Sequence, residues 1–111
     1  FQMMEEALVM AHRKWSTGIY ALWYPVKDMR AVAQFVARLK ERAIPKILRL
    51  ELAVEALRSD GPLAATGLIV VNPPYRLEEQ ARRLLPVLAK VLARGPGASS
   101  LVEVVQGEEI T

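Results

Sequence analysis

Residues 19–24 form an uninterrupted apolar and aromatic run, and this run limits the folds open to the chain more than any other feature. Its side chains show no alternation of polar and apolar positions, which is typical of a strand covered on both faces in a parallel sheet. Pro25 follows at once and ends the strand, because proline donates no ladder hydrogen bond. The run therefore predicts a central strand of an α/β sheet.

Apolar residues on both sides of this run recur at spacings of three and four, as on one face of a helix. The stripe before the run consists of Phe1, Met4, Leu8, Ala11 and Trp15, and residues 16–18 supply the stop. The stripe after it consists of Met29, Val32, Val36, Leu39 and Ala43. We expect a helix on each side of the strand.

Residues 46–54 change to a period of two, which predicts a half-buried strand. One face carries Leu48, Leu50, Leu52 and Val54, and the other carries Arg49 and Glu51. Residues 58–62 have turn composition, and residues 68–71 form another apolar strand. The connection is too short for a helical crossover, so these two strands are expected to pair antiparallel.

A third helical stripe runs through Leu77, Ala81, Leu84, Leu88 and Val91. Pro86 lies within it and is expected to kink or split the helix, because its ring clashes with the preceding turn. Residues 94–97 end this helix and residues 101–105 supply a last strand. The resulting order of helix, strand, helix, strand, strand, helix, strand predicts a layered α/β unit.

The chain has 111 residues, 52% of them hydrophobic, so it can bury one core and residues 1–111 are taken as a single unit. Cysteine is absent, which excludes disulfides and thiolate metal sites and fits the cytoplasm. No apolar run is long enough to span a bilayer. The net charge of +3 suggests a polyanionic partner without specifying one.

The segment Asn72-Pro73-Pro74-Tyr75 directly follows an apolar strand and could form an active site. Methyltransferases that act on amino groups place a polar residue, two prolines and an aromatic in this position. The polar side chain and a proline carbonyl accept hydrogen bonds from the exocyclic amine, and the aromatic stacks on the flipped base. The alternative is that Asn72 ends the strand and the prolines stop its pairing.

Three longer segments resemble the RlmJ family, whose members methylate N6 of an adenine in 23S ribosomal RNA. They are WSTGIYALWYPV at residues 15–26, IPKILRLELAV at residues 44–54 and ATGLIVVNPP at residues 65–74. Their order and spacing are those of the family, and the resemblance covers nearly the whole chain.

The resemblance implies that this chain is the carboxyl-terminal half of a class I, Rossmann-like methyltransferase fold, with a mixed sheet and an antiparallel terminal strand pair. The family's catalytic Asp-Pro-Pro-Tyr motif and its glycine-rich segment for S-adenosylmethionine would both lie upstream of Phe1. We therefore expect no catalytic or cofactor-binding residue here, and the strand before Asn72 would run antiparallel, away from the cofactor.

By the rule that ligands bind at the carboxyl ends of parallel strands, the end of the strand at residues 19–24 lies nearer the reaction centre. The residues that we predict to bind substrate there are Trp23, Tyr24, Pro25, Lys27 and Arg30. The alternative for the two aromatics is that they only finish a packed strand.

Other polar residues give weaker signals. His12 has no partner at a metal-ligand spacing, and no metal site is expected. Glu78 and Glu79 fit the positive end of a helix dipole. Gly95 and Gly97 follow a helix, so they predict a turn and not a phosphate loop. The basic residues Arg38, Lys40, Arg42, Arg76, Arg82 and Arg83 are expected to be mostly solvated, although they could contact RNA phosphates.

Two hypotheses follow. The first is that the chain is part of an RlmJ-like methyltransferase with 23S ribosomal RNA as substrate and is inactive alone. The second is a non-catalytic RNA- or protein-binding α/β module. Under the first, the rest of the longer protein or another chain would cover the free edge of the strand at residues 19–24.

Overall fold

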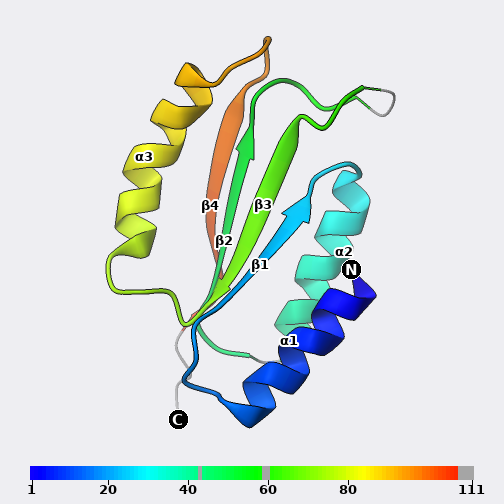
Figure 1. The fold of residues 1–111 in the computed structure, drawn as a ribbon, viewed down its shortest axis with the longest axis vertical. Coiled ribbons are helices and arrows are strands. Elements are labelled where there is room, and N and C mark those ends of the chain that lie inside the picture. The colour runs from blue at the N-terminus through cyan, green and yellow to red at the C-terminus, as the bar shows by residue number, and fades with distance from the viewer. Residues whose placement is uncertain (43, 59–60, 108–111) are drawn as a thin grey trace.

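The computed structural model describes residues 1–42, 44–58 and 61–107. Its elements, in chain order, are α1 (Gln2–Lys14), β1 (Tyr20–Pro25), α2 (Met29–Glu41), β2 (Ile47–Ala53), β3 (Ala65–Val71), α3 (Leu77–Val91) and β4 (Ser99–Gln106) (Figure 1). This is the order predicted from the sequence. No helix in the described ranges is long and apolar enough to cross a membrane.

The four strands form one sheet in the order β1-β3-β2-β4, and each neighbouring pair is antiparallel. The antiparallel pairing of β2 with β3 was predicted and is confirmed. β1 and β2 run in the same direction but are separated by β3, so the described strands contain none of the parallel pairings that a mixed sheet implied.

The prediction of a central strand covered on both faces was wrong for β1 within this chain. β1 is an edge strand, and its side chains alternate between buried or half-buried and exposed positions. Trp23 is 56% exposed, whereas Tyr24 is fully buried. The sequence concealed this alternation because β1 has apolar side chains on both faces. Its outer edge is unpaired among the described residues, as the resemblance implied.

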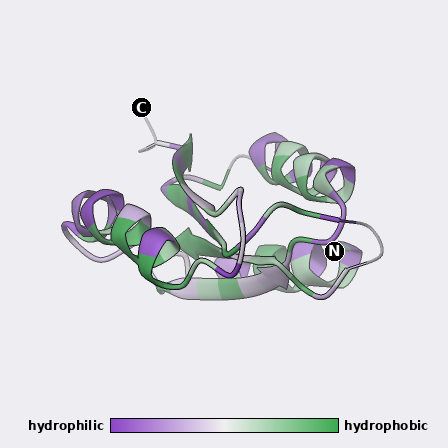
Figure 2. Ribbon diagram, turned by 90° about the horizontal axis from the view of Figure 1, so that it is seen from above, coloured by the Kyte–Doolittle hydropathy of each residue, from purple (hydrophilic) through white to green (hydrophobic). Residues whose placement is uncertain are grey.

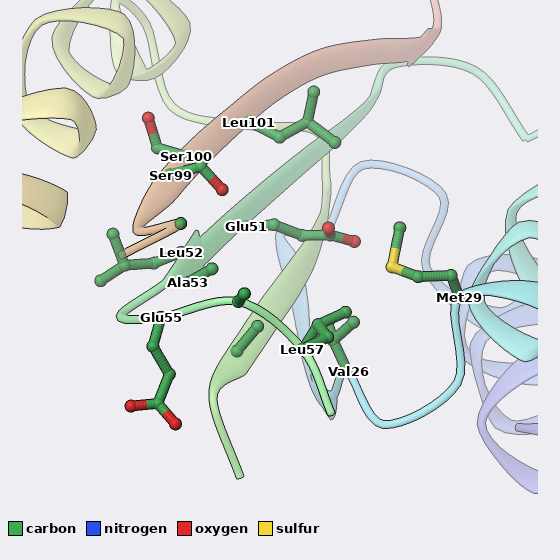
Figure 3. A pocket seen from close by; sticks show the side chains of 13 residues that line it. Val26, Met29, Glu51, Leu52, Ala53, Glu55, Leu57, Ser99, Ser100 and Leu101 are labelled. Atoms are coloured by element: carbon green, nitrogen blue, oxygen red, sulfur yellow. The ribbon is translucent and has the colours of Figure 1, made fainter. Parts of the chain in front are cut away.

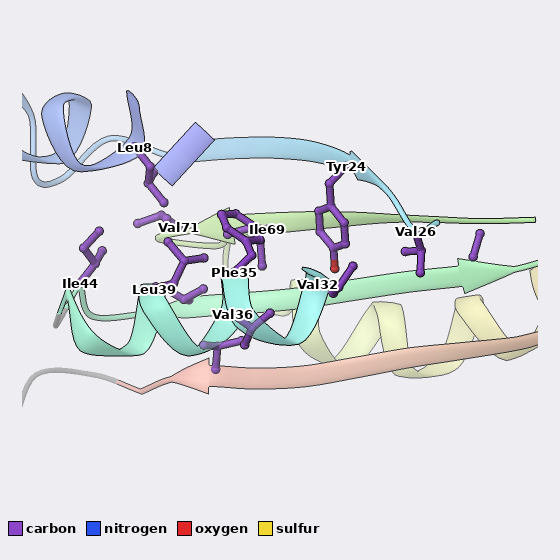
Figure 4. Close-up of a cluster of buried hydrophobic side chains, with 13 residues drawn as sticks. Leu8, Tyr24, Val26, Val32, Phe35, Val36, Leu39, Ile44, Ile69 and Val71 are labelled. Atoms are coloured by element: carbon purple, nitrogen blue, oxygen red, sulfur yellow. The ribbon is translucent and has the colours of Figure 1, made fainter. Parts of the chain in front are cut away.

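The main core lies between the sheet and the two helices α1 and α2 (Figure 4). Val32, Phe35 and Leu39 of α2 pack against Ile69 and Val71 of β3. Phe35 is fully buried, although the predicted α2 stripe omitted it, while Met29 of that stripe is 53% exposed. Ala43, also in the predicted stripe, lies outside the described residues.

α3 covers the opposite face, over β2 and β4. It is one helix across Pro86, so the predicted split does not occur. Its buried residues are Ala81 and Ala89, while Leu84 and Val91 of the predicted stripe are exposed. Each helix shows hydrophilic and hydrophobic sides (Figure 2), which is why three amphipathic segments can form two outer layers.

Candidate functional site

The carboxyl end of β1 carries the residues that the sequence predicted to bind substrate. Trp23 and Tyr24 are adjacent and therefore point to opposite faces of the sheet. Trp23 lies on the same face as α3, whereas Tyr24 enters the core beneath α2. The sequence prediction treated Trp23 and Tyr24 as one aromatic pair and did not distinguish the faces on which they lie.

Tyr24 belongs to a polar network on the α2 side of the sheet. Its hydroxyl donates to Oε2 of Glu51 at 2.6 Å, and Arg49 binds the same oxygen through Nη2 at 2.8 Å. Arg49 also reaches Glu103 of β4, with 3.4 Å between Nη1 and Oε1. Burial, followed by the hydrogen bond to Glu51, raises the pKa of Tyr24 well above its usual 10. The phenol therefore stays protonated as a donor.

Two neighbours fix the ring of Tyr24. It lies edge-on to Phe1 and Phe35, each with its ring centroid 6.1 Å away. The phenol also passes over Gly67 of β3, its register partner. A Cβ atom at residue 67 would lie 2.6 Å from Cε2 of the ring and nearer still to Cζ, so only glycine admits the ring there.

The segment after β1 begins α2 and carries exposed cations. Asp28 caps the helix by accepting a hydrogen bond from the backbone N–H of Arg30 at 2.9 Å. Lys27 and Arg30 are both exposed. The structure therefore places these two predicted site residues beside the end of β1 and leaves both side chains accessible to a ligand.

A cavity of about 380 Å³ lies next to this segment on the α2 side of the sheet (Figure 3). Val26 and Met29 line it from the end of β1 and the start of α2, and Leu101 lines it from β4. Glu51 is also part of its wall. The carboxyl ends of β1 and β2 thus meet the start of β4 around one hollow.

Asn72-Pro73-Pro74-Tyr75 lies at the other end of the sheet. Val71, just before it, pairs with Tyr20 at the start of β1, so the segment is remote from Pro25, which pairs with Thr66. This is the antiparallel arrangement that the resemblance implied. Tyr75 is 94% exposed and packs on nothing extensive.

The side chain of Asn72 has a structural role in this position. Its amide Nδ2 donates to the carbonyl oxygens of Ser16 at 2.9 Å and Gly18 at 2.7 Å, which ties the α1–β1 loop to the end of β3. Asn72 has φ 54°, a left-handed conformation that asparagine tolerates better than most residues. Both amide protons are thus engaged within the protein.

A buried carboxylate joins α1 to α2. Glu5, 5% exposed, accepts hydrogen bonds from Nε of Arg38 at 2.8 Å and of Arg42 at 2.9 Å. The hydrogen bond from Arg42 is the main cause that lowers the pKa of Glu5 below its usual 4.5. Arg38 and Arg42, which were predicted to be solvated, therefore bind Glu5. Their side chains nevertheless stay 41% and 42% exposed.

Sequence reasoning missed Glu5, Gly67 and the pairing of Tyr24 with Glu51. Alternation in β2 did place Arg49 and Glu51 on one face, but not on the face that α2 covers. A signal was available, since two opposite charges two residues apart on a strand point the same way and can satisfy each other. The described residues contain no group of His, Cys, Asp or Glu that could hold a metal ion.

A structural comparison agrees with this arrangement. The crystal structure of protein LPL1258 from Legionella pneumophila str. Philadelphia 1 superposes with a TM-score of 0.78 at 31% sequence identity, over 93% of this chain and 38% of that chain. The α/β architecture with its antiparallel sheet is therefore shared with a solved protein that is considerably longer.

Sequence comparison relates the chain to proteins named as ribosomal RNA methyltransferases. Two relatives, each named ribosomal RNA large subunit methyltransferase J, match nearly the whole chain. The one from Escherichia coli (strain K12) is 35% identical over 95% of this chain, and the one from Haemophilus influenzae is 33% identical over 97%. This chain spans 38% of the length of each relative.

The family model described as "Ribosomal RNA large subunit methyltransferase D, RlmJ" matches residues 1–105. The chain belongs to the RlmJ family. The resemblance stated from residues 15–26, 44–54 and 65–74 is confirmed.

Proposed function

We propose that this chain is the carboxyl-terminal part of an enzyme that transfers a methyl group from S-adenosylmethionine to N6 of an adenine in 23S ribosomal RNA in the cytoplasm. The observation that carries the proposal is the 33–35% identity to two ribosomal RNA large subunit methyltransferases along almost all of the chain. On its own the chain is expected to be inactive.

The fold supports a place in a class I, Rossmann-like methyltransferase. In this assignment β1, β2 and β3 are its fifth, sixth and seventh strands, and α1 and α2 its fourth and fifth helices. The antiparallel direction of β3 is the supporting observation, because the seventh strand of that fold runs against the others.

The described residues do not fit a site for S-adenosylmethionine. Such a site needs a glycine-rich loop between a strand and a helix. Gly95 and Gly97 instead connect a helix to a strand, and the carbonyl of Pro96 between them accepts the N–H of Ala56. We therefore assign cofactor binding and catalysis to the rest of the longer protein.

The role proposed for this chain is to bind substrate RNA at the carboxyl end of β1. Exposed Trp23 and Pro25 offer surfaces for stacking, and Lys27 and Arg30 can neutralise phosphates. Tyr24 is buried, so its contribution is to hold the carboxylate of Glu51 in place.

The rest of the longer protein, or another chain, is proposed to cover the free edge of β1. Exposed apolar residues support this. Leu84, Val87 and Val91, spaced three and four residues apart on α3, form a strip in which each residue is 54–72% exposed, on another side of the helix from buried Ala89. Trp23 lies on the same face of the sheet. Apolar surface of this extent commonly marks an interface.

The experiment is methyl transfer by the longer protein that carries this chain. Unmodified 23S ribosomal RNA is incubated with isotopically labelled S-adenosylmethionine, digested to nucleosides and analysed by mass spectrometry. Label in N6-methyladenosine supports the proposal, and label in another nucleoside, or none, contradicts it. The isolated chain, titrated with S-adenosylmethionine in a calorimeter, should give no binding heat.

The second candidate, a non-catalytic RNA- or protein-binding module, is favoured by the exposed apolar strip of α3. Its distinguishing result is RNA binding by the longer protein without any incorporation of label.

A further inference from the structure

The cavity beside β1 combines an apolar wall with one oriented acceptor. Val26, Met29, Leu57 and Leu101 supply apolar surface from four separate segments of the chain. Figure 3 shows the carboxylate of Glu51 directed into this space, toward Met29. A volume of about 380 Å³ falls within the range of small-molecule sites.

Glu51 is held in one orientation and still has a free acceptor. Oε2 receives both the Tyr24 hydroxyl and the Arg49 guanidinium, at 2.6 and 2.8 Å. Oε1 accepts no hydrogen bond from any residue that the structure describes. Tyr24 and Arg49 already orient the carboxylate, so it can accept a hydrogen bond from a ligand without reorganising.

Exposed basic residues adjoin the cavity lining along the chain, whereas the charged residues of the lining itself, Glu51 and Glu55, are acidic. Lys27 and Arg30 flank the lining residues Val26 and Met29 in sequence, and both are exposed. Arg58, just beyond the lining residue Leu57, is 63% exposed and lies 3.8 Å from Glu55, measured from Nη2 to Oε1. The other carboxylate in the wall, Glu55, is already bound by Arg94 at 2.8 Å.

This arrangement matches a nucleotide. Exposed Lys27 and Arg30, next in sequence to lining residues, suit a phosphate, the apolar walls suit a flat ring, and Oε1 of Glu51 suits an exocyclic amine. A free acid would be repelled by Glu51. A base is the group that is at once flat, apolar on its faces and a donor at its edge.

We propose that this cavity binds an unpaired, amino-bearing nucleobase of the RNA substrate, and that Glu51 accepts a hydrogen bond from its exocyclic amine. The inference rests on the proposed function, because that function brings RNA to this end of the sheet. It adds a second base-binding position, within this chain, to the catalytic pocket assigned to the rest of the protein.

The test is nucleotide binding observed at the Met29 methyl group by NMR, in the longer protein that carries this chain. Adenosine 5′-monophosphate is compared with purine riboside 5′-monophosphate, which lacks only the amine. The resonance of Met29 should shift with adenosine 5′-monophosphate, and that of Met3, 84% exposed on α1, should not. Loss of the amine should weaken binding about tenfold, the effect of one hydrogen bond to a charged acceptor.

A matched pair of variants locates the site. Leu101→Trp fills the cavity and should weaken binding at least about tenfold. Val104→Trp, on the opposite face of β4, should leave it unchanged. If the unmodified protein bound both nucleotides with equal affinity, the role of Glu51 would be overturned. If a folded Leu101→Trp protein bound nucleotide as before, the site itself would be overturned.

The methylation assay separates this inference from the proposed function. Nucleotide binding at Met29 without methyl transfer to 23S ribosomal RNA would contradict the proposed function and leave the site in place. Methyl transfer without nucleotide binding at Met29 would contradict the site alone.

Discussion

Replacing Gly67 with alanine should destabilise the protein through one specific contact, the ring of Tyr24. The ring has little room to move, because Phe1 and Phe35 pack on it and Glu51 holds its hydroxyl at 2.6 Å. A methyl group on residue 67 would overlap the phenol. Relief requires the ring to shift and its hydrogen bond to lengthen.

The size of the effect follows from three contributions. Overpacking a core costs about 1–3 kcal/mol. Losing the Tyr24 hydrogen bond costs about 1 kcal/mol more. Alanine in a strand recovers roughly 0.5–1 kcal/mol relative to glycine. We therefore expect Gly67→Ala to lower the free energy of unfolding by about 1–3.5 kcal/mol.

Urea denaturation in a double-mutant cycle measures this contact. In a Tyr24→Leu background the ring is absent, so Gly67→Ala should become neutral or slightly stabilising. Gly107→Ala is the matched control, because a Cβ atom there would meet no atom within 4 Å. If Gly67→Ala cost the same in both backgrounds, the ring contact would not be its cause and the reasoning would be refuted.

Three further predictions concern other parts of the structure. Glu5→Gln should cost about 1–2 kcal/mol in urea denaturation, with exposed Glu6→Gln neutral, since the partner arginines remain partly hydrated. Because the pKa of Glu5 is lowered in the folded state, its contribution to stability is present above pH 4.5 and lost as the pH falls. Glu5→Gln should therefore weaken the dependence of stability on pH in the acid range. An unchanged pH dependence there would contradict this. Asn72→Ala should destabilise the protein by about 1–2 kcal/mol more than Asn72→Gly, because only glycine keeps the left-handed backbone without strain. If either variant of the longer protein folded stably but lost methyl transfer, a catalytic role of Asn72 would be indicated instead. Leu84→Gln should change the unfolding free energy of this chain by less than about 0.5 kcal/mol yet destabilise the longer protein, and equal effects in both would argue against a covered strip.

The order of helices and strands could be predicted from the sequence alone. The 3.6-residue stripes of α1, α2 and α3 and the period of two in β2 are local patterns, and each reports which side chains leave water. The antiparallel pairing of β2 with β3 also followed, since a short connection leaves no room for a crossover. Family membership was evident from three segments whose order and spacing were preserved.

The sequence predicted less well which apolar side chains point into the core. In β1 both faces are apolar, so sequence could not distinguish exposed Trp23 from buried Tyr24. In α3 the apolar surface is wider than the buried face, and the predicted stripe included Leu84, which is 55% exposed. Where more apolar surface exists than one core needs, only packing against particular neighbours selects what is buried.

The sequence by itself determined the elements, their order and the family, because these depend on residues close together in the chain. Only the tertiary structure decided the candidate site. Tyr24, Glu51 and Gly67 come from three strands, and their contact depends on the register of β1, β3 and β2. The apolar run at residues 19–24 predicted a strand correctly, but its place at the sheet edge depends on β3 inserting between β1 and β2, a long-range pairing that no local pattern encodes.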